Sequence, residues 1–236
     1  SIRFSHAGDL VAGVFADDNQ TVRIWNLRTG KAVGAPLAYA SPILTGNTVP
    51  FGFSPDGRRF AADMVDGVVK VWDVATGRAL FQLAPMRDTA VEWVEFSPDG
   101  TRVVTGNNWG EVQLWDAAMG QPAGPIIYHA GSITVATFSS DGRYLLTAAG
   151  DGTARVWDGH TAAPVGEPAI NGGSIRSAAF SPDGSRFVTA LLGNTARIWD
   201  TRTGQPLTEP LVHAGRLYEA AFSPDGRFVE TEMAAA

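Results

Sequence analysis

One short segment recurs along this chain of 236 residues at an almost fixed interval. The copy at residues 149–158 reads AGDGTARVWD, and its relatives carry tryptophans 42 to 47 residues apart: Trp25, Trp72, Trp115, Trp157 and Trp199. A second mark, FSPDG or a close variant, keeps step with them through Ser5, Ser54, Ser97, Ser139, Ser181 and Ser223. Such a period predicts stacked copies of one supersecondary unit, each needing its neighbours to bury its apolar face.

Within one period the apolar residues alternate along strand-length segments. In the fourth copy these segments are 132–138, 144–150, 153–158 and 163–170. Alternation at a period of two is typical of strands with one buried face, whereas no segment shows a helical spacing. In each SPDG turn the proline presets φ, the aspartate bonds back to a following amide and the glycine accepts a positive φ. Each period therefore predicts four short antiparallel strands.

These features together resemble the WD40-repeat family, in wording most closely its bacterial members. The shared features are the period, the four strands and the Trp-Asp dipeptide that ends the third strand. The resemblance implies an all-β fold, a β-propeller of four-stranded antiparallel blades with five full WD-type repeats plus the first half of a sixth. We expect a single domain over residues 1–236, with blades at 1–39, 48–84, 90–127, 132–170 and 174–212 and a partial blade at 216–232.

Composition narrows the classes of function. The net charge is −6 and no run of Lys or Arg interrupts it, so we expect no nucleic-acid partner. The chain has no cysteine, which excludes thiolate nucleophiles, disulfides and Cys-bearing zinc sites. His6 and His160 stand alone, so we expect no metal and no cofactor. No apolar run reaches the length of a membrane span and no signal leader opens the chain, which predicts a cytoplasmic protein without a membrane partner.

The resemblance also implies a structural tetrad in the fourth copy: His129, Thr147, Asp151 and Trp157. In the family's arrangement the aspartate accepts a hydrogen bond from the imidazole. The other imidazole nitrogen bonds the threonine hydroxyl, which accepts the indole N–H. A catalytic triad is the alternative, but a threonine held by a tryptophan does not face a substrate, and no oxyanion-hole loop accompanies it. We therefore expect no catalytic residue.

The other repeats keep only parts of this tetrad. Thr105 with Trp115 and Thr189 with Trp199 retain its threonine–tryptophan pair. Trp109 and Gly193 stand at the aspartate position, and Arg87 and Asn171 stand at histidine positions. The resemblance thus predicts a complete tetrad in the fourth repeat alone.

Loops at one end of the propeller form the usual docking face of the family. Nine residues in the matching loops have no evident structural role: Met86, Arg87, Asn108, Trp109, Tyr128, Leu191, Leu192, Arg216 and Tyr218. Large apolar side chains at loop tips, with arginine nearby, have the composition of interface hot spots. The alternative for Trp109 is a cap folded over its own blade. Trp93, on an innermost strand, is a candidate plug of the central channel.

These observations favour a non-catalytic protein–protein interaction scaffold or sensor module that binds a protein or peptide. Two alternatives stay open. One is a propeller hydrolase or small-ligand sensor using the central channel, with Glu95 and Glu219 as the available carboxylates. The other is the regulatory WD40 region of a larger signalling ATPase or kinase. The sixth unit lacks its third and fourth strands, so we expect a ring, seven-bladed by resemblance, that sequence beyond this chain or another chain completes.

Overall fold

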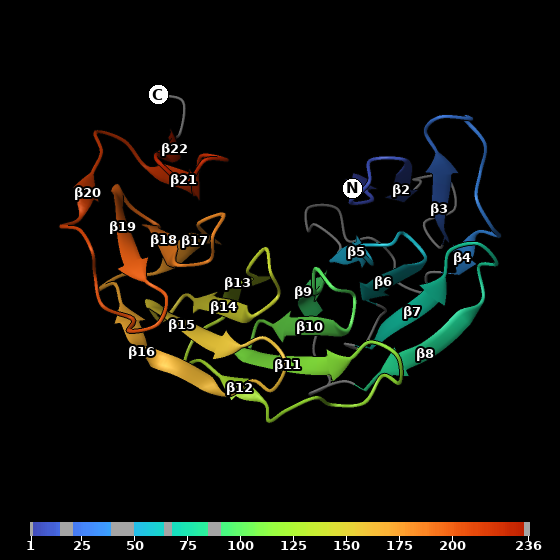
Figure 1. Cartoon of the computed structure of the whole chain (residues 1–236), viewed down its shortest axis with the longest axis horizontal. Helices are drawn as coiled ribbons and strands as arrows, with labels where there is room; N and C mark the ends of the chain where they lie inside the picture. The colour runs from blue at the N-terminus through green and yellow to red at the C-terminus, as the bar shows by residue number, and fades with distance from the viewer. Residues whose placement is uncertain (1, 15–20, 39–49, 64–67, 85–90, 234–236) are drawn as a thin grey trace. The chain divides into compact units, whose positions relative to one another are not determined.

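A computed structural model describes residues 2–14, 21–38, 50–63, 68–84 and 91–233. Within these ranges the structure contains β-strands and no helix (Figure 1), so the expected all-β class is confirmed. The chain divides into two compact units. The first comprises residues 1–107 and 115–122, and the second comprises residues 108–114 and 123–236. The expectation of a single domain over residues 1–236 stays a prediction.

The first unit contains the first two repeats and the first hairpin of the third. β1 (Ile2–Phe4), β2 (Leu10–Val14), β3 (Thr21–Asn26) and β4 (Leu37–Ala38) form one antiparallel sheet in chain order. β5 (Phe51–Phe53), β6 (Arg59–Asp63), β7 (Val69–Asp73) and β8 (Ala79–Leu83) form the next. β9 (Val91–Phe96) pairs antiparallel with β10 (Arg102–Asn107).

The second unit continues the same order of strands. The start of β11 (Glu111–Asp116) pairs with β12 (Ile127–Tyr128). Two four-stranded antiparallel sheets follow. They are β13 (Ile133–Phe138), β14 (Tyr144–Ala149), β15 (Thr153–Asp158) and β16 (Pro164–Ile170), then β17 (Ile175–Phe180), β18 (Arg186–Leu191), β19 (Thr195–Asp200) and β20 (Leu211–Val212). β21 (Leu217–Phe222) and β22 (Val229–Met233) form a two-stranded sheet. Four strands per repeat, followed by half a repeat, are therefore confirmed.

Side-chain hydrogen bonds hold the turn between the first two strands of a repeat. Ser181 Oγ donates to Asp183 Oδ1 at 2.6 Å, and the backbone N–H of Arg186 donates to Ser181 Oγ at 3.0 Å. Gly184 has a φ of +67°, which a glycine adopts without steric cost. Hydrogen bonds from Ser181 and Ser185 lower the pKa of Asp183 to about 2. The same Ser–Asp bond recurs in four other copies, so the second sequence mark is a turn sequence.

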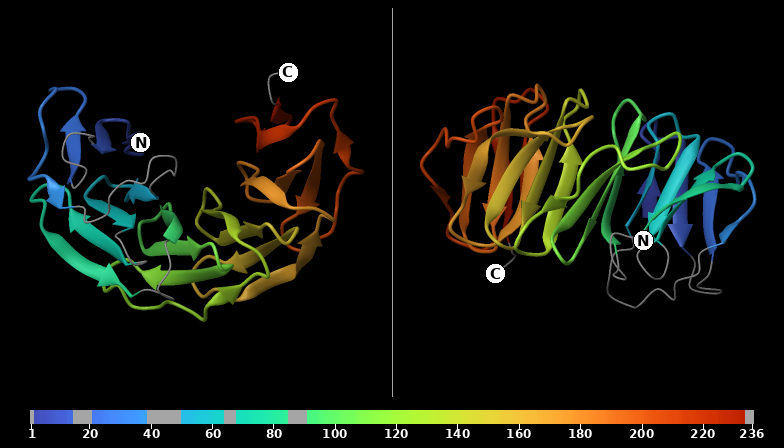
Figure 2. Two further views of the ribbon diagram at one scale, coloured as in Figure 1. Left: turned by 180° about the vertical axis from the view of Figure 1, so that it is seen from behind. Right: turned by 90° about the horizontal axis from the view of Figure 1, so that it is seen from below.

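Successive sheets within each unit pack through alternate residues of their strands. In the second unit Leu146 of β14 packs with Phe187 and Trp199 of the following repeat, and Val188 of β18 packs with Leu217 of β21. Figure 2 shows these sheets following one another from yellow to red. The tryptophan of the WD dipeptide thus lies in the contact with the preceding sheet. A single repeat could not bury it, which explains why the repeats occur in series.

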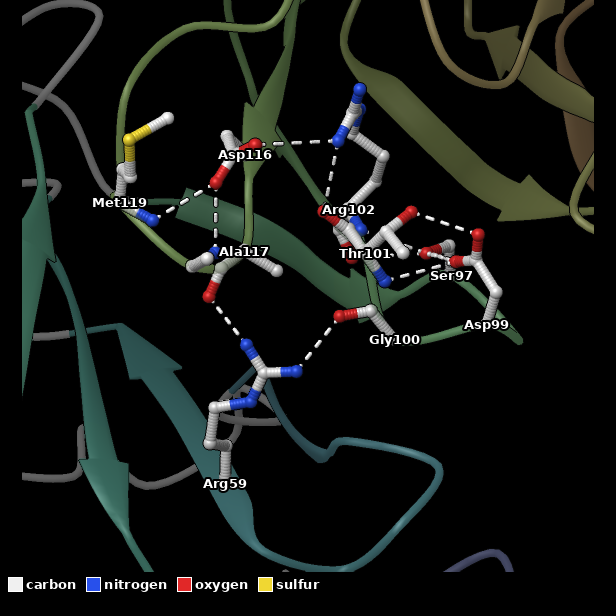
Figure 3. Close-up of polar contacts among 10 residues, drawn as sticks. Arg59, Ser97, Asp99, Gly100, Thr101, Arg102, Asp116, Ala117 and Met119 are labelled. Atoms are coloured by element: carbon white, nitrogen blue, oxygen red, sulfur yellow. Dashed lines mark hydrogen bonds and ion pairs between the residues drawn. The ribbon is translucent and has the colours of Figure 1, made fainter.

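Arginines at the start of some second strands reach into the turns of the next repeat. Figure 3 shows Arg59 of β6 donating to the carbonyl oxygens of Gly100, at 2.8 Å, and of Ala117. In the second unit Arg186 of β18 donates to the Gly226 carbonyl at 2.8 Å. These bonds satisfy turn carbonyls that no ladder reaches, and they hold neighbouring repeats in register.

Candidate functional site

The four residues predicted for the tetrad come together in the second unit, around β14 and β15. Trp157 Nε1 lies 2.8 Å from Thr147 Oγ1, and Thr147 Oγ1 lies 2.8 Å from His129 Nε2. The His129 and Thr147 side chains are buried. Asp151 lies in the turn before β15, with its Oδ2 atom 3.7 Å from His129 Nδ1. The sequence-predicted residues therefore belong to one polar cluster.

A residue that sequence reasoning missed, Thr153, links the histidine to the aspartate. His129 Nδ1 lies 2.9 Å from Thr153 Oγ1, which lies 2.8 Å from Asp151 Oδ1. The expected direct bond between Asp151 and His129 is wrong, because 3.7 Å is too long for a hydrogen bond. The carboxylate is held away by the local backbone. Its Oδ1 accepts the N–H of Thr153 and its Oδ2 accepts the N–H of Ala130, both at 2.8 Å.

The direction of each hydrogen bond follows from the carboxylate end. Asp151 can only accept, so the Thr153 hydroxyl donates to it and accepts from Nδ1–H of His129. Nε2 then accepts from the Thr147 hydroxyl, whose oxygen accepts the indole N–H of Trp157. With a neutral imidazole, each side-chain N–H and O–H group of this cluster donates to an acceptor within it. Burial lowers the pKa of His129 to about 4, although the Asp151 carboxylate acts in the opposite direction.

This arrangement supports the fold and leaves no reactive group exposed. The Thr147 hydroxyl is fully buried and bonded on both sides, and both imidazole nitrogens of His129 are occupied. Burial would raise the pKa of Asp151, but hydrogen bonds from Thr153 and Ala130 hold it below its ordinary value. A nucleophile needs access to a substrate and a free base, and this cluster offers neither.

Two other repeats show how much of the cluster is constant. Trp115 Nε1 donates to Thr105 Oγ1 at 2.9 Å, and Trp199 Nε1 donates to Thr189 Oγ1 at 2.9 Å. In the fifth repeat the Thr189 hydroxyl donates to Asn171 Oδ1 at 2.6 Å, so an amide oxygen replaces the imidazole nitrogen. The hydrogen bond from the tryptophan indole to the threonine hydroxyl is thus common to these repeats. The group that accepts the threonine proton differs between the fourth and fifth repeats.

Trp109 and Tyr128 lie on adjacent backbone segments next to this cluster. Tyr128 pairs with Glu111 across β11 and β12, and the backbone N–H of His129 donates to the Gly110 carbonyl at 2.8 Å. The side chain of Trp109 is 63% exposed and that of Tyr128 is 56% exposed, which does not fit a Trp109 cap over its own sheet. Gly110 has a φ of +83°, and a Cβ there would lie 2.3 Å from the His129 carbonyl oxygen. Glycine therefore permits the close approach that holds the Trp109 turn.

Leu191 and Leu192 have different environments. Leu192 is 48% exposed, whereas Leu191 is half-buried and packs against the apolar cluster between β14 and β18. The expectation that Leu191 lies in an exposed binding surface is corrected, because it occupies the core-facing position at the end of a strand. Met86 and Arg87 lie outside the described residues.

The remaining predicted binding residues are exposed but not equivalent. Asn108 and Arg216 are exposed in turns. Tyr218 is 45% exposed on β21, and the guanidinium of Arg176 lies 4.7 Å from its ring centroid. Such a cation–π contact gives Tyr218 a partner within the protein. Trp109 and Tyr128 are both more exposed than Tyr218.

Sequence reasoning missed two exposed apolar residues at the position of Tyr128 in the next repeats. Ile170 ends β16 opposite Thr153, and Val212 ends β20 opposite Thr195, just as Tyr128 ends β12. Both side chains are 70% exposed. The signal was available, because 128, 170 and 212 are one period apart. Apolar–polar alternation alone could not show that these side chains are exposed, because the outermost strands are too short to indicate which of their faces is buried.

The residues considered for the central channel, Trp93, Glu95 and Glu219, have different surroundings. Trp93 faces Gly106 across β9 and β10, and its buried indole N–H has no hydrogen-bond partner in the described chain. Glu219 is exposed and Glu95 is half-buried. Among the described residues no three His, Asp or Glu side chains gather at metal-binding distance. No described helix is long and apolar enough to cross a membrane.

Comparison with known proteins adds one match. The family model described as WD40, WD domain, G-beta repeat matches residues 47–73, 84–116, 120–158 and 168–200, more than half of the chain. Each matched segment ends at the aspartate that follows a repeat tryptophan. The match does not separate bacterial from other members. A search of the curated proteins found no match.

Proposed function

Since this chain belongs to the WD40 repeat family, we propose that it is a non-catalytic scaffold or sensor module that binds a protein or peptide partner. The proposed binding site is the loop-end surface, defined as Trp109, Tyr128, Ile170, Leu192 and Val212 of the second unit. WD40 domains are commonly protein-interaction scaffolds, which supports the class of function. The location of the binding surface goes beyond what family membership implies.

The exposed pair Trp109 and Tyr128 carries the proposal. Burying a large aromatic side chain away from water is favourable. Exposed aromatic residues that lie near one another are therefore typical of a surface that a partner covers. The backbone beneath the pair is fixed by the Gly110–His129 hydrogen bond and by the buried tetrad cluster. A rigid aromatic anchor loses little conformational entropy on binding, which favours affinity.

The rest of the surface has the composition of an interface. Ile170, Leu192 and Val212 add apolar area in the two following repeats. Asn108 and Arg216 supply polar groups beside it. An apolar centre with polar and arginine residues around it is the usual arrangement of a protein-binding site.

The test compares a double variant with a control at the other end of β11. Trp109→Ala with Tyr128→Ala should weaken binding by at least about 2 kcal/mol to a partner captured from the native host and then purified. Met119→Ala is the control, because Met119 is 66% exposed in the turn after β11. The control should bind like the parent protein. Equal binding by all three proteins, at unchanged stability, would overturn the proposed surface.

The alternative functions gain less support. A hydrolase would need an accessible nucleophile, and the Thr147 hydroxyl is buried and bonded. A generic esterase and phosphatase screen tests that alternative directly. A regulatory region of a larger ATPase or kinase would be a special case of the scaffold, with the partner domain supplied by the same polypeptide.

A further inference from the structure

Strands β17 and β21 each contain a β-bulge near their first residue. In β17 the pairing with β18 passes from Ile175 directly to Ser177, so Arg176 opposes no residue of the neighbouring strand. Tyr218 is the extra residue of β21 in the same way. A β-bulge re-aims the side chain of its extra residue, and both side chains are exposed here. The two positions are one period apart, so the bulge displays a side chain at the same place in both repeats.

The two bulge residues contact each other. The guanidinium carbon of Arg176 lies 4.7 Å from the centroid of the Tyr218 ring, and β17 lies beside β21 (Figure 1). Such a contact covers one face of the guanidinium, whereas its five N–H donors lie in the plane of the group. Within the described part of the chain, the Arg176 side chain makes no hydrogen bond and no ion pair. The ring therefore orients a cation whose donors are free for a ligand.

Backbone hydrogen bonds bring Leu192 and a second arginine, Arg216, to the same place. The N–H of Leu192 donates to the carbonyl of Ser174 at 2.8 Å. Leu217, the residue after Arg216, donates its N–H to the carbonyl of Gly193, the residue after Leu192, at 2.7 Å. The side chains of Leu192 and Arg216 are both exposed. These exposed residues form what we call the arginine patch: Arg176, Leu192, Arg216 and Tyr218.

The exposed charges around the loop-end surface are positive, although the whole chain has a net charge of −6. Six segments surround this surface: 108–111, 128–134, 149–153, 170–176, 191–195 and 212–218. Their exposed charged residues are Arg176 and Arg216, because Glu111 is buried and the half-buried Asp151 already accepts three hydrogen bonds. Glu219, the next residue of β21, forms no ion pair with a described residue. Charge complementarity therefore favours an acidic ligand.

We propose that the loop-end surface recognises an acidic segment of its protein partner, with one carboxylate side chain bound by Arg176 and a second by Arg216. This inference rests on the proposed function and names the chemistry of the partner. The donors of a guanidinium match both oxygens of a carboxylate, so Arg176 would form two parallel hydrogen bonds with it. Leu192 and Tyr218 would contact apolar side chains next to the carboxylates. Arg176 is then a residue that determines specificity.

A phage library of random dodecapeptides tests the proposal, because it assumes no partner sequence. Peptides are selected on the full 236-residue chain and, separately, on its Arg176→Gln/Arg216→Gln variant. The control is Arg202→Gln/Arg227→Gln, which removes the same charge from two exposed arginines outside the arginine patch. Peptides selected on the parent and on the control should be enriched in Asp and Glu, and those selected on the arginine-patch variant should not.

Synthetic copies of the selected peptides are then measured by fluorescence anisotropy. Arg176→Gln should weaken binding at least about tenfold. Arg176→Lys should weaken it about threefold, because lysine keeps the charge but loses the bidentate geometry. Tyr218→Leu should also weaken it about threefold, since the guanidinium loses the ring that orients it. Replacing Asp and Glu of the peptide by Asn and Gln should abolish the difference between the parent and Arg176→Gln. Urea denaturation should be the same for all these proteins, because the substituted side chains are exposed.

Three results would overturn the proposal. The first is a selection without enrichment of Asp and Glu, or one in which no peptide prefers the parent to the arginine-patch variant. The second is equal binding of acidic peptides by the arginine-patch variant and the control. The third is tighter binding of a DNA duplex of equal charge to the same arginines, which would make a nucleic acid the occupant.

The Trp109→Ala/Tyr128→Ala variant separates this proposal from the proposed function. Peptides that need the two aromatic residues but carry no excess of Asp or Glu would leave the proposed surface intact and contradict the acidic partner. Acidic peptides that need Arg176 but bind the aromatic variant normally would support the arginine patch and contradict the aromatic anchor.

Discussion

The fourth and fifth repeats fold into the same four-stranded sheet but support it with different polar clusters. In the fourth, hydrogen bonds run from Trp157 through Thr147 and His129 to Thr153 and Asp151. In the fifth, they stop at an asparagine, because Trp199 bonds Thr189 and Thr189 bonds Asn171. The hydrogen bond from the tryptophan indole to the threonine hydroxyl is therefore the constant element. The acceptor beyond it is adjustable, provided that it satisfies the hydroxyl proton.

The largest expected effect concerns the element that the two repeats share. Trp199 is buried and stacks on Phe187 with ring centroids 6.2 Å apart, so Trp199→Ala should lower the free energy of unfolding by about 4 kcal/mol. Trp157→Ala should cost about 3 kcal/mol, because Trp157 is only half-buried. Urea denaturation measures both. The exposed Trp109→Ala is the control, with a loss below about 0.5 kcal/mol, and a loss there as large as at Trp199 would contradict the packing argument.

Acid should separate the two repeats, because only the fourth contains a buried imidazole. The pKa of His129 falls from 6.5 to about 4 in the folded protein, so the unfolded chain binds this proton more readily. Its contribution to stability is complete above pH 6.5 and is lost as the pH falls toward 4, by about 3 kcal/mol in total. His129→Asn, which copies the fifth repeat, should remove this dependence. Urea titrations between pH 7.5 and 4.5 measure it, and parallel pH profiles for the two proteins would refute it.

At neutral pH the longer cluster should be the more sensitive to truncation. His129→Ala removes the acceptor of the Thr147 hydroxyl and the imidazole N–H that the Thr153 oxygen accepts, and should cost about 2 kcal/mol. Asn171→Ala removes only the acceptor of the Thr189 hydroxyl and should cost about 1 kcal/mol. The comparison is made by urea denaturation at pH 7.5. Equal losses would mean that the extension to Thr153 and Asp151 adds no stability.

The smallest expected effect concerns the linking threonine. Thr153→Val keeps the shape of the side chain but removes the bridge between His129 and Asp151, so about 1 kcal/mol should be lost. Thr195→Val changes the corresponding residue of the fifth repeat, where Gly193 replaces the carboxylate. That variant should lose less than about 0.5 kcal/mol. Thermal denaturation of the pair checks the difference, and a larger loss at Thr195 would contradict the role given to Thr153.

The period of the sequence predicted most of the fold, because spacing and turn chemistry are local properties. The Ser-Pro-Asp-Gly segments became turns and the alternating segments became strands, with the half repeat at 217–233 as expected. The completion of the ring and the plug by Trp93 stay predictions. Both depend on how distant parts of the chain lie relative to one another, which local patterns do not encode.

The site was only partly predictable, for reasons that particular residues make clear. The position of Thr153 between His129 and Asp151 depends on side-chain rotamers and on which amides capture the carboxylate, here those of Thr153 and Ala130. The exposure of Ile170 depends on which side of a short outer strand faces solvent. Residue type and spacing do not fix such details, whereas they do place a tryptophan near a threonine ten residues earlier.

The close approach of Gly110 to the His129 carbonyl has a consequence for how such a surface diversifies. Gly152 makes a similar close approach in the next repeat, where a Cβ would lie 2.9 Å from the Gly173 carbonyl oxygen and φ is +84°, so a side chain at either glycine would be strained. The residue immediately before each glycine differs between the two repeats: Asp151 is bonded to Thr153 and Ala130, whereas Trp109 stands at the same backbone position and is exposed. One backbone position therefore carries a residue of the buried cluster in one repeat and a residue of the exposed surface in the other. Mutational libraries at position 109 should explore new specificities without a search for new folds.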